Sequence, residues 1–352
     1  MNNIFIFNYE LTFNKIGGEF FSVNRMKDLL QKNSYKIFFV NKLNFFNKKN
    51  FFNKNTILYF NGIFHKKLFL FLGINLFYKS KIIISPKGEL LNGALEIKKN
   101  KKKFFIYFLS LLMKKNIIFH CTSDFEKQQV KKIFNKNKIL VARDMLDKNF
   151  NVIKSKSFNL IKKKFEKKKL FKKKLHIVFY STINKKKNLK FAIQIISKLN
   201  RSVVFDIYGN TYENKYLSDC LSEIKNFKEN IECNYFGEIK NKDVLKILNK
   251  YDIFLFPTLG ENFGYVILEA LMSGCFILIS KKTTPWSFLE KLRLSKEINL
   301  YEKKKWLQFL ENFDNRKYFN KKIIKKNYFY VIKKYFDSIT IEKENLRLFK
   351  NI

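Results

Sequence analysis

Short apolar runs that alternate with longer helix-like stretches constrain the fold of this sequence most strongly. Ile4–Phe7 and Lys81–Ser85 have the length and aliphatic content of strands that are buried on both faces of a parallel sheet. Phe20–Lys32 and Phe104–Lys114 carry helical patterns between such runs. This alternation predicts a doubly wound α/β domain, which we place at residues 1–150. Its expected strands are Ile4–Phe7, Lys36–Val40, Thr56–Asn61, Lys81–Ser85 and Asn116–Thr122.

A second series of the same kind begins at His176, and 352 residues are enough for two such domains. The fold class expected is therefore α/β, with two doubly wound, Rossmann-like domains that face a cleft. Ligands of such sheets bind outside the carboxyl ends of the strands. The expected strands here are His176–Tyr180, Ser202–Tyr208, Ile231–Phe236, Ile253–Pro257 and Phe276–Ser280. The expected helices are Asn188–Leu199, Asn214–Lys225, Asp243–Asn249 and Tyr265–Met272.

Lysine content sets the expected boundaries. Residues 151–175 are rich in lysine, and we interpret them as a linker or a solvated helix face, with an anion-binding patch as the alternative. Residues 176–330 form the expected second domain, and the chain is mostly helical after Trp286. For residues 331–352 we expect a helix that packs back on the first domain.

The net charge is +42, from 71 basic and 29 acidic residues. Codon bias toward A and T explains most of it, since Lys, Asn, Phe and Ile are all abundant. The remainder fits a polyanionic partner, which is a nucleic acid, an anionic membrane surface or a phosphate-bearing substrate. No recognised nucleic-acid module is present, so that class is the weakest. Cysteine and histidine spacing gives no zinc motif or disulfide framework, which fits a reducing cytoplasm.

The most informative segment is Phe254–Cys275, in which a buried strand ends at Pro257 and a glycine-containing loop precedes a helix. The start of a helix offers free backbone N–H groups to an anion, and glycine allows close approach. The carboxylates of Glu261 and Glu269 would accept hydrogen bonds from hydroxyls, so the segment suits a nucleotide sugar. The alternative is structural: Glu261 complements the helix dipole, and Glu269 is an incidental surface residue.

Glu261 and Glu269 stand eight positions apart, and this Glu-(seven residues)-Glu pattern resembles the signature of retaining GT-B glycosyltransferases of family 4, the glycosyl transferases group 1. Thr284-Pro285-Trp286 resembles a motif of their bacterial surface-polysaccharide branch. The resemblance extends along nearly the whole chain, through Gly17-Gly18, Asn61-Gly62, Ser85-Pro86-Lys87-Gly88, His120-Cys121-Thr122-Ser123, Lys187-Asn188-Leu189, Gly209 and Gly237.

The resemblance implies a role for each matching residue. Glu261 and Lys187 would be catalytic, with Glu261 on sugar hydroxyls and Lys187 neutralising the departing diphosphate, and Glu269 would bind the ribose. The other donor-binding residues would be Asn262, Phe263, Gly264, Lys186, Thr182, Gly18 and Gly209. Contacts to acceptor or sugar would come from Lys87, His120 and Asn61. The family needs no metal and no cofactor, and no Asp-x-Asp motif is present.

Three positions depart from the family pattern. Thr182 stands where an arginine usually grips the diphosphate, and threonine cannot make that bidentate contact. Lys185 and Lys186 are near enough to substitute as point charges. Lys87 replaces another arginine, and Asn61 replaces a histidine.

The expected function is sugar transfer, with retention, from a nucleotide sugar to a glycan or lipid-linked acceptor in surface-polysaccharide or lipopolysaccharide biosynthesis. The donor is UDP- or GDP-linked, and the sequence does not choose between them. The expected location is the cytoplasm, at the inner face of the membrane. Phe104–Met113 fits a buried helix, or a helix lying on an anionic membrane. A degenerate GT-B relative, an epimerase or a glycan binder, is the alternative, followed by a basic nucleic-acid-binding protein.

Overall fold

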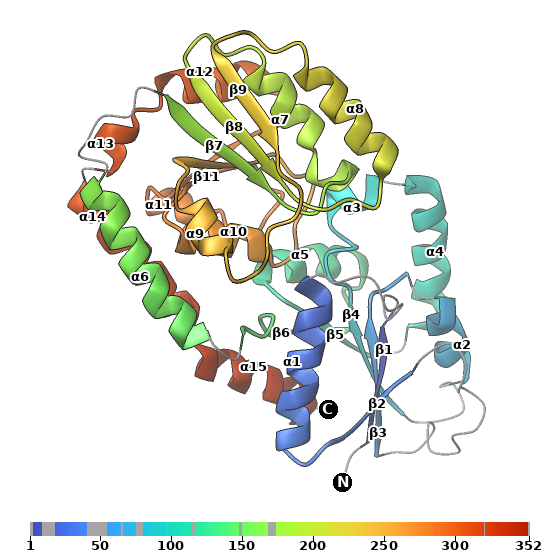
Figure 1. The fold of residues 1–352 in the computed structure, drawn as a ribbon. Helices are drawn as coiled ribbons and strands as arrows, with labels where there is room; N and C mark the ends of the chain where they lie inside the picture. Colours follow the sequence, from blue (N-terminus) through green and yellow to red (C-terminus); the bar gives the residue numbers. More distant parts are fainter. Residues whose placement is uncertain are drawn as a thin grey trace. The chain divides into compact units, whose positions relative to one another are not determined.

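A computed structural model describes residues 3–8, 18–40, 55–64, 66–74, 80–96, 98–113, 117–147, 150–167, 174–319 and 321–350. The chain divides into two compact units (Figure 1). The first unit is Met1–Lys148 together with Asp337–Ile352, and the second is Asn149–Phe336.

The first unit contains a six-stranded sheet in the order β2-β1-β3-β4-β5-β6, and every neighbouring pair is parallel. Burial on both faces explains the apolar runs, since every residue of Thr56–Asn61 is buried. Stacked rings of Phe7 and Phe60, with centroids 4.4 Å apart, lie in the core. The strands are β1 (Asn3–Asn8), β2 (Lys36–Phe39), β3 (Thr56–Asn61), β4 (Lys81–Ser85), β5 (Ile118–Cys121) and β6 (Lys138–Val141).

The last helix of the chain belongs to the first unit. Arg143 donates hydrogen bonds from Nη2 and Nε to the Glu344 carboxylate, at 2.6 and 3.0 Å. Asn345 donates to the Arg143 carbonyl, and the Phe349 ring lies 6.0 Å from that of Tyr59. The helices of this unit are α1 (Gly18–Lys32), α2 (Lys66–Ile74), α3 (Asn92–Glu96), α4 (Lys99–Leu112), α5 (Asp124–Ile133) and α15 (Ser338–Lys350).

The second unit contains a parallel sheet in the order β12-β11-β10-β7-β8-β9. The strand order reverses between β7 and β10, the two central neighbours. A doubly wound sheet opens a ligand crevice at such a point, because the connections on its two sides leave in opposite directions. The strands are β7 (Leu175–Tyr180), β8 (Val203–Tyr208), β9 (Ile231–Tyr235), β10 (Ile253–Phe256), β11 (Phe276–Ser280) and β12 (Ser295–Ile298).

Helices surround the second sheet, and each carries an apolar face toward the core. They are α6 (Phe150–Lys167), α7 (Leu189–Ile196), α8 (Asn214–Ile224), α9 (Val244–Leu248), α10 (Tyr265–Met272), α11 (Phe288–Lys291), α12 (Lys303–Asn312), α13 (Asn315–Phe319) and α14 (Lys322–Tyr335), with a 3₁₀ turn, η1, at Lys185–Lys187. The expected fold class of two doubly wound α/β domains is thus confirmed.

The lysine-rich segment fits the solvated helix face of the sequence analysis rather than the linker. Its described part, residues 150–167, is helix α6, and residues 168–173 lie outside the described residues. Ile161 and Phe165 are buried one turn apart, and the Ser157 hydroxyl donates to the Met272 carbonyl at 2.5 Å. The buried Lys164 ammonium donates to the Tyr251 carbonyl at 2.6 Å. These side chains follow helical spacing, so the lysines occupy the solvated face of a helix that packs into the second unit.

This packing predicts that Ile161→Ala destabilises the second unit by about 2–5 kcal/mol, because the fully buried side chain would leave a cavity. Lys162→Ala is the matched control, since Lys162 is exposed on the same turn and its loss should change stability little. Urea unfolding of both variants gives the comparison. Equal stability of the two variants would mean that residues 150–167 behave as a linker.

Candidate active site

Two loops leave the sheet of the second unit at its reversal point, one after β7 and one after β10. Three hydrogen bonds to backbone carbonyls tie them together. The Leu259 N–H donates to the Lys186 carbonyl at 2.8 Å, and the Asn188 side-chain amide donates to the Pro257 carbonyl at 3.0 Å. The Thr258 hydroxyl also donates to the Lys186 carbonyl, at 3.2 Å. The loops that carry Lys187 and Glu261 are therefore held in one fixed arrangement.

Lys187 and Glu261 form an ion pair across these loops, between Nζ and Oε2. Their side chains are only 15% and 12% exposed. The ammonium also lies 5.6 Å from the centroid of the Phe256 ring. The pair brings together the two residues that the sequence singled out for catalysis, although 74 positions separate them.

The charge state of Glu261 follows from its surroundings. Burial alone would raise its pKa, but the positive charges of Lys187 and Lys186, together with hydrogen bonds, hold the pKa below its ordinary value. The carboxylate is therefore ionised at neutral pH. It can accept hydrogen bonds from hydroxyls, and it does not supply a proton.

The loop before α10 is tightly built around Gly264, whose φ of +74° is left-handed. A Cβ there would lie 2.9 Å from the Glu261 Cγ. The buried Trp286 donates from its indole nitrogen to the Phe263 carbonyl at 2.7 Å, so it packs in the loop. The Asn262 N–H donates to Glu261 Oε1 at 3.2 Å. The glycine therefore allows the backbone to fold closely around the Glu261 side chain.

Glu269, on α10, lies beside Tyr180, the last residue of β7. Burial raises the pKa of the Tyr180 phenol, and the charge of Glu269 and a hydrogen bond to it raise the pKa further. The phenol therefore stays protonated and keeps its hydrogen bond to Glu269. Sequence reasoning missed Tyr180, although its position at the carboxyl end of a strand beside the reversal point is a signal that could have found it.

Gly209 follows β8 and packs against the residues that follow its two neighbouring strands, β7 and β9. Its N–H donates to the Gly237 carbonyl at 2.7 Å, and a Cβ on Gly209 would lie 1.8 Å from the Ser181 carbonyl oxygen. The neighbouring Thr182 is exposed. In this structure Gly209 permits close packing of the loop that leads to Lys187, while Thr182 faces solvent.

Four further candidate residues lie in the first unit. Lys87 and Asp144 form a buried ion pair at 2.6 Å, to which the Ser22 hydroxyl of α1 adds a hydrogen bond at 2.7 Å. Sequence reasoning missed Asp144, which follows β6 in a segment that carries no motif. Gly18 is the first residue of α1, and Gly17 lies outside the described residues.

Asn61 is the last residue of β3, His120 lies one residue before the end of β5, and both are buried. His120 Nδ1 lies 2.8 Å from the Tyr59 hydroxyl, and Nε2 lies 2.9 Å from the Ala142 carbonyl. The neutral ring satisfies both contacts when Nε2 carries the proton. Asn61 lies in register with Ser85 of β4. In this structure His120 and Lys87 therefore serve an internal polar network.

That network predicts a pH dependence of stability. Burial and the nearby Lys87 charge lower the pKa of His120 from 6.5 to about 4. Between pH 6.5 and about 4 the unfolded chain binds a proton at this histidine more readily than the folded chain does. The contribution of His120 to the free energy of unfolding is therefore complete above about pH 6.5 and is lost as the pH falls toward about 4.

Thermal unfolding across this range should show the effect. We expect the fall in unfolding midpoint to be smaller in His120→Gln than in the wild type, because the amide keeps both hydrogen-bonding roles and does not titrate. Identical slopes in the two proteins would contradict a neutral, buried imidazole.

Gly209→Ala should destabilise the second unit by at least about 2 kcal/mol, because the new Cβ would collide with a backbone carbonyl at a φ of +147°. Gly73→Ala is the control, since a Cβ there would meet nothing within 4 Å. Chemical unfolding of both variants measures the difference. A Gly209→Ala protein as stable as the control would show that the strand ends are not this close.

Comparison with known proteins gives evidence that is independent of the geometry. Residues 161–292 match the family model "Glycosyl transferases group 1", and this segment contains every candidate residue of the second unit. A Klebsiella pneumoniae protein described as an uncharacterized 41.2 kDa protein in the cps region is 28% identical over 219 residues. That match covers 61% of this chain and 56% of the relative, so just over half of the relative is spanned.

Solved structures match the whole chain at low identity. The Anabaena protein Alr3699/HepE, crystallised with UDP and glucose, is 12% identical with a TM-score of 0.65, and both chains are fully covered. WaaG, a glycosyltransferase involved in lipopolysaccharide biosynthesis, is 10% identical with a TM-score of 0.65, and 98% of this chain and 99% of that chain are covered. These likenesses concern the fold. Two parallel, doubly wound sheets with flanking helices identify it as GT-B, as the sequence predicted.

Proposed function

We propose that this protein is a glycosyltransferase that moves a sugar from a nucleoside diphosphate donor to a glycan or lipid-linked acceptor. The observation that carries the proposal is the Lys187–Glu261 ion pair at the reversal point of the second sheet. It places a cation and an ionised carboxylate where a doubly wound sheet binds its ligand. The match of residues 161–292 to the group 1 model supports the same activity.

Lys187 suits the leaving group of this reaction. A nucleoside diphosphate gains negative charge as the glycosidic bond breaks, and fixed positive charge near its oxygens lowers the barrier. Lys186 and Lys187 stand in the 3₁₀ turn η1, close enough to Glu261 that both charges lower its pKa. In the proposal these lysines take the place of the arginine that family members carry at the position of Thr182, and no metal ion is required.

The two carboxylates suit the sugar parts of the donor. Glu261 is ionised and only 12% exposed, and its carboxylate can accept hydrogen bonds from hydroxyls of the transferred sugar. Glu269 is oriented by Tyr180 and would hold the ribose hydroxyls. The backbone around Asn262, Phe263 and Gly264 would close on the sugar or the diphosphate, while Gly209 would shape the loop beneath it.

The finer proposal is retention of anomeric configuration, as in family 4, and a role in surface-polysaccharide or lipopolysaccharide biosynthesis. The relative in the cps region and the fold likeness to WaaG favour that pathway. The UDP and glucose bound by Alr3699/HepE favour a nucleotide-sugar donor. In the first unit, Gly18 would face the donor, and Lys87, His120 and Asn61 would contribute to sugar or acceptor contacts through their network.

Incubation with a panel of UDP- and GDP-linked sugars, with and without oligosaccharide or polyprenyl-linked acceptors, tests the activity. Transfer requires that free nucleoside diphosphate and a glycosylated acceptor appear together, which mass spectrometry detects. A conversion of one nucleotide sugar into another without acceptor would instead indicate an epimerase. Binding of donor with no turnover on any acceptor would indicate a degenerate relative.

Two substitutions separate the carboxylate roles. Glu269→Ala should raise the KM for donor about tenfold or more with little change in kcat, because it removes ribose contacts that exist before the reaction. Glu261→Gln should lower kcat by roughly 10²–10³, since it removes charge near the reacting carbon. Glutamine keeps the side-chain shape, so Lys187 retains a hydrogen-bonding partner.

Steady-state kinetics with the active donor give both constants. Glu232→Ala is the control, because Glu232 lies near the amino end of β9 and the candidate site lies at the carboxyl ends of the strands. Glu232 forms only an exposed ion pair with Lys174. Wild-type constants in Glu269→Ala and Glu261→Gln would mean that the donor binds elsewhere.

A further inference from the structure

Helix α4 of the first unit exposes a stripe of large apolar side chains. Phe104, Tyr107, Phe108 and Leu111 are 67%, 62%, 43% and 66% exposed. Their spacing of three and four residues places them on one face of the helix. The opposite face is buried, since Leu109 is fully inaccessible and Phe105 packs edge-on against Phe69 of α2 at 4.5 Å. The expectation of a simple buried helix is therefore only half met.

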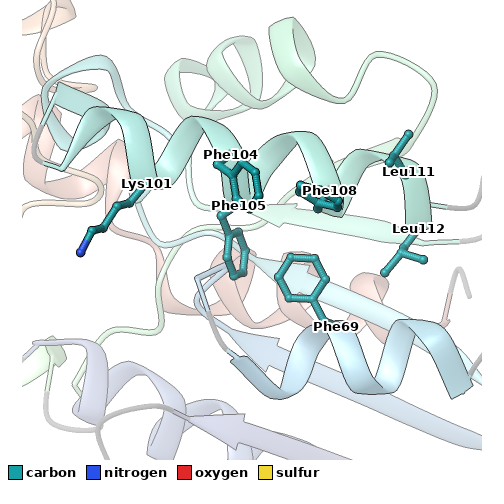
Figure 2. A pocket seen from close by; sticks show the side chains of 7 residues that line it. All are labelled: Phe69, Lys101, Phe104, Phe105, Phe108, Leu111 and Leu112. Carbon is teal, nitrogen blue, oxygen red and sulfur yellow. The ribbon is translucent and has the colours of Figure 1, made fainter.

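A cavity of about 380 Å³ lies between α4 and α2 (Figure 2). Figure 2 shows Phe69 of α2 facing the phenyl rings of α4, with Lys101 at the end of the row. The apolar lining is formed by Phe69, Phe104, Phe105, Phe108, Leu111 and Leu112. The exposed stripe thus continues inward as an apolar recess, which isolated surface aromatics do not form.

Positive charge flanks the apolar stripe. Five lysines occur between Lys98 and Lys103, and α4 contains no acidic residue. Lys99 pairs with Glu96, and Lys102 donates to the Ala94 carbonyl at 2.5 Å. Lys101 and Lys103 are exposed, and no described residue forms a salt bridge with either. An uncompensated basic turn beside a large apolar stripe matches the chemistry of an anionic lipid surface, which is apolar beneath negative headgroups.

We propose that this α4 face docks on an anionic lipid bilayer, with the apolar stripe inserted at the acyl boundary and the lysines at the headgroups. Charge complementarity favours an anionic lipid surface over an apolar groove on a protein. An apolar groove would offer no negative groups to the lysines of the basic turn. No helix in the described part of the chain is long and apolar enough to cross a membrane. The inference goes beyond the proposed transferase activity and does not depend on it, because α4 (Lys99–Leu112) contains none of the proposed donor or acceptor residues.

Flotation with vesicles tests the apolar part. The full chain should bind vesicles of equimolar phosphatidylcholine and phosphatidylglycerol. Phe104→Ser with Leu111→Ser should weaken this binding roughly tenfold or more, because two side chains that would enter the acyl region are lost. The control is Tyr301→Ser with Ile339→Ser, since both side chains are similarly exposed, at 83% and 62%, on other surfaces. Circular dichroism checks that both double variants are folded.

A charge-matched pair of variants tests the electrostatic part. A protein of charge +42 binds anionic vesicles to some degree on any face, so net charge must be held constant. Lys101→Glu with Lys103→Glu and Lys322→Glu with Lys326→Glu change the charge equally, and all four lysines are exposed. The first pair should weaken binding clearly more than the second, and raised salt should diminish that difference.

Equal binding by the α4 variants and their controls would overturn the proposal, since attachment would then follow net charge alone. A concentration-dependent dimer in light scattering, abolished by Phe104→Ser with Leu111→Ser while vesicle binding is unchanged, would also overturn it. In that case a second copy of this chain covers the face.

Discussion

The ion pair between Lys187 and Glu261 is the interaction on which the site depends. Both groups are largely removed from water, so each needs the other, and removal of one partner of a buried pair commonly costs about 3–5 kcal/mol. The reversal of strand order between β7 and β10 makes the pair geometrically available, and the hydrogen bonds between the two loops hold it in place. Under the proposed function, the anionic oxygens of a nucleotide sugar would pair with Lys187 and its hydroxyls with Glu261, so one ligand would satisfy both charges.

The sequence predicted the strands that are buried on both faces, because their apolar runs depend only on local composition. It missed β6 and β12, which are edge strands of only four residues, and β12 has a single aliphatic residue. It left residues 150–167 open between a linker and a solvated helix face, because the abundant lysines obscured the helical spacing of Ser157, Ile161 and Phe165. In a chain this basic, the buried positions of a helix carry more information than its overall composition.

The site shows the same division between local pattern and tertiary pairing. The motif around Glu261 located the loop and the helix that follows it, and the resemblance singled out Lys187. Neither indicated that these two residues pair, or that Tyr180 lies beside Glu269, because sequence spacing does not reveal partners across strands. In the first unit, Asp144 binds both Lys87 and Ser22 in a buried network, and no sequence motif indicated this network. The sequence singled out residues with recognisable chemistry as candidates, and it did not indicate the partners that orient them.

Amide hydrogen exchange with added UDP, and separately with GDP, tests most directly whether the Lys187–Glu261 pair marks the donor site. The loops after β7 and β10 are tied to each other, so a bound nucleoside diphosphate should slow exchange in both at once. The account predicts slower exchange at residues 181–188 and 258–265, and loss of that effect in Lys187→Ala. Slowed exchange confined to other segments, or an unchanged effect in Lys187→Ala, would contradict it.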